Sequence, residues 1–303
     1  MTNVKRAGGA ALARAALAGN PSDGYGGAVL AVTLPAWRAR AQAVPAAEPE
    51  IVPANDLVEA TVRRFARELG PAGLETAVQW STSIPQRVGL GSSSALVIAV
   101  VRALCELHGL ELEPDRLAAF ALAVENEDLG IVAGLQDRVA QAYEGLTFMD
   151  FGAGGENGSG PHGTYEQLDP ALLPPIVIAW RTDAAGHSGD IPAALHARHR
   201  GGEPLVAAAM RELADAARGA RDALVEGDLG RFATSVDRTF DLRRGLVELD
   251  PLCVEMIELA RASGASANYT GSGGAIVAIC PDTSRLEVVV RALSELGCEV
   301  ARA

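Results

Sequence analysis

The sequence predicts an α+β protein of two halves, and three observations carry this prediction. Apolar residues recur at helical spacing in several segments, strand-like apolar runs lie between them, and the two do not alternate in a strict βαβα order. The chain has 303 residues, which is long enough for two domains. The glycine-rich segment 152–163 is poor in apolar residues and predicts a connector, so we expect domains over residues 1–155 and 156–303.

The first half is predicted to begin with two strands over residues 11–34, where the turn-rich sequence GNPSDGYGG separates two apolar runs. A helix is predicted over residues 55–69, with Asn55 as its N-cap and Gly70 as its stop signal. The alternating sequence LETAVQWSTSIP predicts a strand, which leads into the segment RVGLGSSSA and an apolar helix. Two more helices are predicted in this half, over residues 114–128 and 134–143.

The second half combines two buried strands, PIVIAW and GAIVAIC, with several helices. Long helices are predicted over residues 203–226 and 228–246. Asp250 is expected to cap the next helix, in which Pro251 suits the first turn and Gly264 ends it. The sequence SRLEVVVRALSELG predicts a last helix.

The composition excludes several classes of partner. A net charge of −12 argues against nucleic acid or an anionic membrane surface as a general partner. No apolar stretch reaches the roughly 18 residues that would span a membrane. The four cysteines lie far apart without a CxxC pair, which disfavours zinc and predicts a reducing, cytoplasmic setting. We expect a small-molecule partner, with the protein a monomer or a homodimer.

The segment RVGLGSSSA has the layout of an anion-binding loop at the start of a helix. Glycines let the backbone approach a ligand, and serine amides at a helix N-terminus meet an anion with orphan donors and a partial positive charge. A serine hydroxyl there can also ligate Mg²⁺. The alternative is a serine N-cap on a buried helix. Lys5 is the only lysine of the chain, so no lysine in the core can clamp a phosphate. The candidate phosphate-binding residues are Gly89, Leu90, Gly91, Ser92, Ser93 and Ser94.

Acidic side chains supply candidates for catalysis and for metal binding. Asp137 is expected on the polar face of its helix, where a carboxylate near a phosphate site can orient and deprotonate a hydroxyl nucleophile. The alternative is an ion pair with Arg138 or Arg102. Three further carboxylates end the predicted helix 114–128, where the helix dipole disfavours them: Glu125, Glu127 and Asp128. A bound cation would offset that cost, and a solvated face is the alternative.

Two polar loops are further candidates for ligand binding. In YTGSGGA, Gly271 and Gly273 predict either a close backbone approach to a ligand or a tight turn. In GNPSDGYGG, the side chains of Asn20, Asp23 and Tyr25 suit a polyhydroxylated ligand, although an ordinary turn would also use such residues. Two histidines that are three residues apart, His196 and His199, are predicted to form a surface pair.

Together these motifs resemble one family. IPQRVGLGSSSA is similar to the glycine- and serine-rich signature of the GHMP kinases, YTGSGGA resembles that family's third motif, and RAALAGN resembles its first, with Arg14 five residues before a glycine. Within the family, GNPSDGYGG, ENEDLGIVAGLQDRVAQAYEGLTFMDF and FDLRR resemble segments of the plant-type glucuronokinases, which are sugar-1-kinases acting on glucuronic acid.

The resemblance implies an N-terminal domain like ribosomal protein S5 domain 2, a ferredoxin-like C-terminal domain, and ATP with Mg²⁺ in the cleft between them. It implies that Asp137 faces the sugar hydroxyl as the catalytic aspartate and that Arg14 stabilises the transferred charge. Ser93 and Glu125 would ligate Mg²⁺, while the loop amides hold the ATP phosphates. The acceptor-binding residues would be Asn20, Asp23, Tyr25, Arg87, Gly271 and Gly273.

Some assignments stay open at this stage. Ser94 stands where the family usually has alanine, so the Mg²⁺ ligand is either Ser93 or Ser94. The arginines that could pair with a uronate carboxylate are Arg87, Arg181, Arg243 and Arg244. The alternatives to glucuronate are another acceptor, such as a galactose-like hexose, homoserine or a mevalonate derivative. A further alternative is a catalytically silent ligand-binding protein of the same fold.

Overall fold

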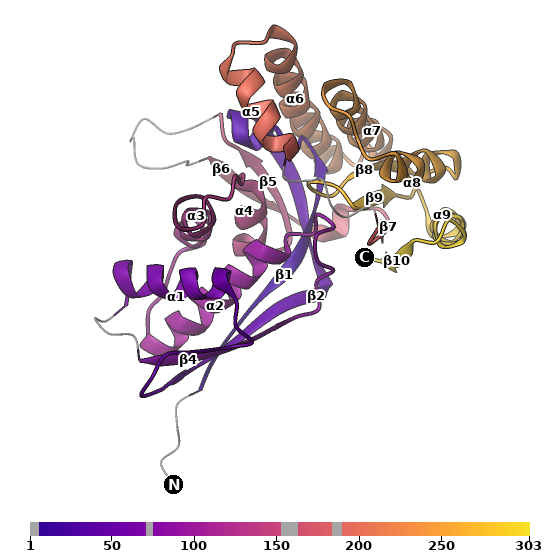
Figure 1. Ribbon diagram of the computed structural model, residues 1–303. Coiled ribbons are helices and arrows are strands. Elements are labelled where there is room, and N and C mark those ends of the chain that lie inside the picture. The colour runs from indigo at the N-terminus through magenta and orange to yellow at the C-terminus, as the bar shows by residue number, and fades with distance from the viewer. Residues whose placement is uncertain (1–5, 71–74, 153–162, 184–189) are drawn as a thin grey trace. The chain divides into compact units, whose positions relative to one another are not determined.

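The structure is a computed structural model that describes residues 6–70, 75–152, 163–183 and 190–303, the side chains of 190–194 excepted (Figure 1). The chain forms two compact units that interleave along the sequence. Unit 1 comprises Met1–Ala13, Leu34–Pro85 and Gly91–Glu144. Unit 2 comprises Arg14–Thr33, Gln86–Leu90 and Gly145–Ala303. The division after residue 155 stays a prediction, and most of the expected connector lies outside the described residues.

The pair of strands expected over residues 11–34 is present as the long strands β1 and β2. Each of these strands has residues in both units. Strand β1 spans Ala7–Ala18 and pairs with β2, which spans Ala28–Pro45 and continues well beyond the predicted end. The short 3-10 helix η1 (Ser22–Tyr25) lies in the loop between them. This strand pairing is why the compact units do not divide the chain into two consecutive pieces.

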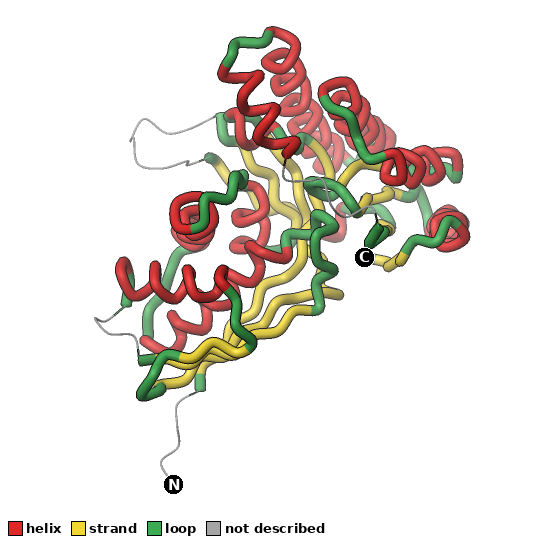
Figure 2. Tube along the Cα trace, in the orientation of Figure 1, coloured by secondary structure: helices red, strands yellow, loops and turns green. Residues whose placement is uncertain are grey.

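Unit 1 packs four helices on one face of its strands (Figure 2). Strand β4 pairs antiparallel with the C-terminal half of β2 and parallel with β3. The strands that lie wholly in this unit are β3 (Glu50–Val52) and β4 (Thr76–Thr82). Its helices are α1 (Asp56–Glu68), α2 (Ser92–His108), α3 (Pro114–Ala123) and α4 (Gln136–Tyr143). Helix α2 is buried on nearly every side, because its sequence is apolar all round.

Local signals set the start of α1 as predicted. The side chain of Asn55 accepts hydrogen bonds from the amides of Leu57 and Val58 at 3.0 and 3.1 Å. At the other end, the amide of Gly70 donates to the carbonyl of Phe65 at 2.7 Å. A capping side chain and its amides are three residues apart at most, so sequence alone could predict this contact.

The helix expected over residues 114–128 is α-helical only to Ala123 and then widens into a π-helical turn, η2 (Val124–Asp128). The acidic residues of this turn are balanced by arginine. Arg64, a buried side chain of α1, donates to Asp128 at 2.9 Å and to Glu127 at 2.8 Å. Glu127 is also largely exposed to solvent, as one sequence alternative expected, and the cation site proposed for this cluster stays a prediction. The arginine partner was not predicted, because it lies more than 60 residues away in the sequence.

Unit 2 contains a second sheet in the order β10-β7-β9-β8, antiparallel throughout. Helices α8 and α9 pack on it through Met256, Ile257, Val289 and Leu293. The sheet that contains β1 and β2 also contains β5, which pairs with the N-terminal half of β2 and with β6. The remaining strands are β5 (Leu146–Asp150), β6 (Thr164–Leu168), β7 (Ile176–Trp180), β8 (Ser266–Tyr269), β9 (Ala275–Ile279) and β10 (Glu299–Arg302).

Four helices of unit 2, α6 to α9, lie where the sequence predicted them, whereas the helix over residues 190–200, α5, was not predicted. Asp250 caps α8 by accepting from the amide of Leu252 at 2.8 Å. A 3-10 turn, η3, covers Pro170–Leu172. The helices are α5 (Asp190–Arg200), α6 (Pro204–Glu226), α7 (Leu229–Leu246), α8 (Pro251–Ala262) and α9 (Thr283–Glu295). In the described part of the chain, no helix combines the length and the apolar character needed to cross a membrane.

We predict that Gly9→Ala destabilises unit 1 and that Gly8→Ala does not. A Cβ at Gly9 would overlap the carbonyl oxygen of Ala99 in α2 and lie 2.5 Å from the amide nitrogen of Ala103, whereas a Cβ at Gly8 meets open space. Overpacking of this kind costs about 1–3 kcal/mol. Urea unfolding of the two variants measures the difference, and equal stabilities would contradict this packing of β1 on α2.

Candidate functional site

The loop before α2 has the backbone geometry of an anion cradle. Gly91 is the N-cap at φ 72°, and the first helical hydrogen bond runs from the amide of Ala95 to its carbonyl at 3.1 Å. The three serine amides in front of Ala95 precede that bond and have no acceptor within the helix. Ser93 is exposed, whereas Ser94 is fully buried and donates its hydroxyl to the carbonyl of Gly91 at 3.2 Å. The hydroxyl that can reach a ligand is therefore that of Ser93.

A buried ion pair lies beside Asp137 in unit 1. The guanidinium of Arg138 holds the Glu125 carboxylate with two of its nitrogens, Nε at 2.8 Å and Nη2, and both side chains are almost completely buried. Its third nitrogen, Nη1, donates to the carbonyl of Gly134 at 2.7 Å and lies 3.6 Å from Oδ2 of Asp137. Two arginines were considered as ion-pair partners of Asp137. Arg138 lies next to it, whereas Arg102 forms its ion pair with Glu144.

Gln141 is a structural part of this site that the sequence analysis missed. Its buried amide donates to the carbonyl of Gly91 at 2.8 Å and to that of Leu12 at 2.9 Å. It therefore links α4, which carries Asp137, to Gly91, the N-cap residue of α2. A polar side chain one turn after Asp137 in an otherwise apolar stretch was the available signal, because a buried amide needs partners.

In unit 2, the side chain of Arg14 joins three segments that lie far apart in the sequence. Its Nη1 donates to the carbonyl of Gly89 at 2.7 Å and to that of Thr270 at 2.6 Å. The backbone amide of Arg14 donates to Leu90 at 3.1 Å, and the hydroxyl of Thr270 donates to Gly89 at 2.9 Å. The guanidinium is thus a buried positive charge held against the carbonyl of Gly89.

The second glycine loop packs against the first, backbone to backbone. A Cβ at Gly271 would lie 2.5 Å from the carbonyl oxygen of Gly89 and 2.9 Å from Nη2 of Arg14. Gly273 adopts φ 131°, which disfavours any side chain, although the space around it is open. At Gly271 the close approach is to the backbone of the first loop, and an approach to a ligand stays a prediction.

The polar residues expected to read an acceptor lie on or beside η1. Asn20 is buried, donates to the carbonyl of Tyr269 at 3.3 Å and accepts from Asn268 at 3.1 Å. Asp23 is also buried. Arg87, by contrast, is exposed and adopts φ 60° in the loop.

Tyr25 is held by the two histidines that sequence predicted as a surface pair. The ring of His196 stacks on Tyr25 with centroids 4.8 Å apart, and His199 meets it edge-on at 4.7 Å. Burial, with the charge of Asp23 added, raises the pKa of Tyr25 to about 12, and burial lowers the pKa of His196. Both histidines are half-buried, and their contact with Tyr25 was not predicted because the tyrosine lies some 170 residues earlier in the chain.

The donor set for a divalent cation is small. Among the described residues, no group of three or more His, Cys, Asp or Glu side chains could hold a metal. The implied ligands are the exposed hydroxyl of Ser93 and the carboxylate of Glu125, which Arg138 already binds. Such a set fits Mg²⁺ that nucleotide phosphates and water largely coordinate, as kinase sites commonly do.

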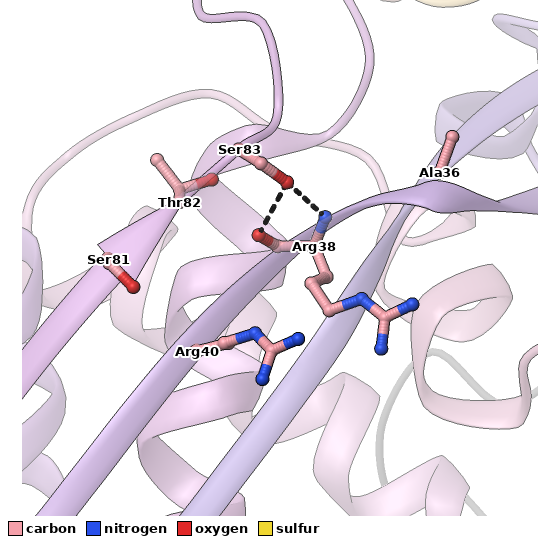
Figure 3. A pocket seen from close by; sticks show the side chains of 6 residues that line it. All are labelled: Ala36, Arg38, Arg40, Ser81, Thr82 and Ser83. Carbon is pink, nitrogen blue, oxygen red and sulfur yellow. Dashed lines mark hydrogen bonds between the residues drawn. The ribbon is translucent and has the colours of Figure 1, made fainter.

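A separate hollow of about 480 Å³ lies at the junction of β2 and β4 in unit 1 (Figure 3). Ser83 closes it by accepting from the amide of Arg38 at 3.0 Å. None of the residues that the sequence analysis proposed for the site lines this hollow. The lining residues are Ala36, Arg38, Arg40, Ser81, Thr82 and Ser83.

Comparison with known proteins agrees with the motifs. The GHMP kinases N terminal domain matches residues 56–145, and the GHMP kinases C terminal domain matches residues 220–297. Glucuronokinase 1 of Arabidopsis thaliana is 31% identical over 89% of this chain and 84% of its own length. Probable glucuronokinase 2 of the same plant is 37% identical over 68% of this chain and 57% of its own length. The phosphomevalonate kinase of Streptococcus pneumoniae shares the fold, with a TM-score of 0.78, 18% identity and coverage of 98% of this chain and 99% of that one.

We predict that Arg138→Met costs about 3–5 kcal/mol of stability, because it leaves the buried Glu125 carboxylate without its partner. The double variant Arg138→Met with Glu125→Met should be more stable than Arg138→Met alone, since no charge is then left uncompensated. Arg63→Met is the control: its pair with Glu59 is exposed and should contribute no more than about 1 kcal/mol. Urea unfolding measures the stability of all three variants. A double variant that is less stable than Arg138→Met alone would refute the pairing.

Proposed function

Because the chain belongs to the GHMP kinase family and its relatives include sugar kinases, we propose that it is an ATP-dependent sugar-1-kinase acting on D-glucuronate. The γ-phosphoryl group of ATP would pass to the anomeric hydroxyl, giving glucuronate 1-phosphate and ADP. The 31% identity to glucuronokinase 1 over most of both chains supports this choice of acceptor.

One observation carries the proposal. The Arg14 side chain binds Gly89 of the serine-rich loop and Thr270 of the C-terminal glycine loop, so the three motifs of the family meet at a single guanidinium. An arrangement that only capped a buried helix would not need a buried cation behind the loop. A transferred phosphoryl group would be stabilised by one, since little covalent chemistry falls to the protein in phosphoryl transfer and charge stabilisation dominates.

In the proposed reaction, the free amides at the start of α2 bind phosphate oxygens, and the positive end of the helix dipole adds to their attraction. Arg14 stabilises the negative charge of the transferred group from behind the loop. Asp137 orients the anomeric hydroxyl and accepts its proton as the new oxygen–phosphorus bond forms. Arg138, with its nearest nitrogen 3.6 Å from Asp137, favours the ionised carboxylate that this role requires.

Ser93 and Glu125 would hold Mg²⁺, with the phosphates supplying most of the other ligands. When bound, the ion neutralises charge on the β- and γ-phosphate oxygens. The salt-bridged state of Glu125 makes its contribution smaller than that of a carboxylate without a cationic partner.

A coupled assay of ADP release over a panel of acceptors tests the proposal. Glucuronate should give the highest kcat/KM, above galactose, homoserine and mevalonate. Turnover with one of the other acceptors and none with glucuronate would leave a kinase of different specificity. Ligand binding without turnover of any acceptor would indicate a silent member of the family.

We predict that Asp137→Asn keeps its affinity for ATP and loses kcat by roughly 10²–10⁴-fold, since the amide can orient the hydroxyl but cannot accept its proton. Asp56→Asn is the matched control, because Asp56 is also an aspartate in the first turn of a unit 1 helix and is exposed. Steady-state kinetics and nucleotide titration give both quantities. A kcat for Asp137→Asn close to that of the parent enzyme would reject the proton-accepting role.

We predict different consequences for the two neighbouring serines. Ser93→Ala should weaken the binding of Mg²⁺ with an unreactive ATP analogue by about tenfold, because its exposed hydroxyl is the proposed ligand. Ser94→Ala should instead cost about 1 kcal/mol of stability through the lost hydrogen bond to Gly91. Calorimetric titration and urea unfolding separate the two effects, and the reverse pattern would transfer the metal role to Ser94.

A further inference from the structure

Arg243 of α7 is a buried cation that the proposed reaction does not use. Its side chain lies within unit 2 and the residue is only 7% exposed. One nitrogen, Nη2, donates to the carbonyl of Gly271 at 2.9 Å, and the guanidinium lies 5.0 Å from the centre of the Tyr269 ring. The other terminal nitrogen, Nη1, is buried and has no hydrogen-bond acceptor among the described residues.

A buried guanidinium in this state is costly, since its charge has left water without gaining a carboxylate. Within the described ranges, no Asp or Glu forms an ion pair with Arg243. Burial lowers its pKa to about 10, so the group still carries its charge at neutral pH. A buried N–H that lacks an acceptor is uncommon in proteins and calls for an explanation.

Arg243 has a second cation close by. Arg14 binds the carbonyl of Thr270, and Arg243 binds the carbonyl of the next residue, Gly271, so the two cations flank one short backbone segment. The charge of Arg14 adds to burial in lowering the pKa of Arg243, and the carboxylate of Asp23 acts in the opposite direction. An anion bound at the unmatched nitrogen would offset both the burial and the repulsion.

The other arginines considered as carboxylate readers have different surroundings. Arg181 makes a two-pronged ion pair with Asp183 at 2.9 and 2.6 Å. Arg244 is half-exposed and pairs with Glu258 at 2.8 Å. Arg87 is exposed, so water already solvates its charge. Of these four, Arg243 has both a buried charge and an unmatched donor.

We propose that Arg243 determines the specificity of the kinase by pairing with a carboxylate of the sugar acceptor. This inference rests on the proposed function and deepens it. A uronic acid supplies an acceptor for the unmatched nitrogen and a negative charge together, and a charge-assisted hydrogen bond of this kind is about twice as strong as a neutral one. A neutral hexose, with a hydroxymethyl group at the same carbon, supplies no charge. Sites built around a buried polar group reject ligands that leave it unpaired.

The matched acceptors glucuronate and glucose test this inference, because they differ only at the carbon that bears the carboxylate. In Arg243→Met, kcat/KM for glucuronate should fall by about 100-fold, while the value for glucose should change by less than about threefold. Arg243→Lys keeps the charge and should recover part of the loss. Arg244→Met is the matched control: it removes the adjacent, half-exposed arginine and should leave the preference for glucuronate unchanged.

Several outcomes would overturn the inference. An equal loss on both sugars in Arg243→Met, with unaltered nucleotide affinity, would mean that Arg243 only supports the Gly271 loop. A wild-type enzyme that phosphorylates glucose as well as glucuronate would leave the kinase intact and remove the role of Arg243. Wild-type protein that turns over no acceptor would refute the proposed function itself. Should Arg243→Met fail to fold, Arg243→Lys decides: we expect a reduced preference for glucuronate over glucose in that variant, and an unchanged preference would refute recognition of the carboxylate by the guanidinium.

Discussion

The contact on which unit 2 depends is the Arg14 guanidinium bound to the carbonyls of Gly89 and Thr270. Its two acceptors are 181 residues apart in the sequence, and the hydroxyl of Thr270 joins them a second time. A buried cation that donates to backbone carbonyls holds both loops rigid, because loosening either loop would leave a desolvated charge without acceptors. The glycine at 271 is required by the same contact, since any side chain there would enter the guanidinium.

In unit 1 the charges that need compensation are carboxylates. The π-helical turn η2 brings three acidic residues to the end of a helix, where the dipole disfavours them. Arg64 balances two of these and Arg138 the third, so charge is compensated within the protein. The same Arg138 lies beside Asp137, which makes a structural ion pair part of the electrostatic environment of the proposed catalytic residue.

Much of the fold could be predicted from sequence where the cause is local. The caps at Asn55 and Asp250 bind amides two or three residues away, and the apolar periods of α6, α7 and α9 lie within single segments. Sequence could not predict contacts whose partner is distant. His196 belongs to the surroundings of Tyr25 because of a ring stacked against it, and the helix over residues 114–128 ends in a π turn whose acids face an arginine of α1.

The sequence alone was enough to predict most of the helices, the order of the three motifs and the glycines that their backbone requires, but not the short elements α5, β3, β6 and β10. Only the tertiary structure decided that the hydroxyl of Ser93 is exposed while that of Ser94 is turned inward, and that Glu125 is bound by Arg138. It also decided that Arg243 is buried with an unmatched donor. The reason is physical: a residue's type sets which bonds it can form, but its burial and its partners depend on segments that only folding brings together.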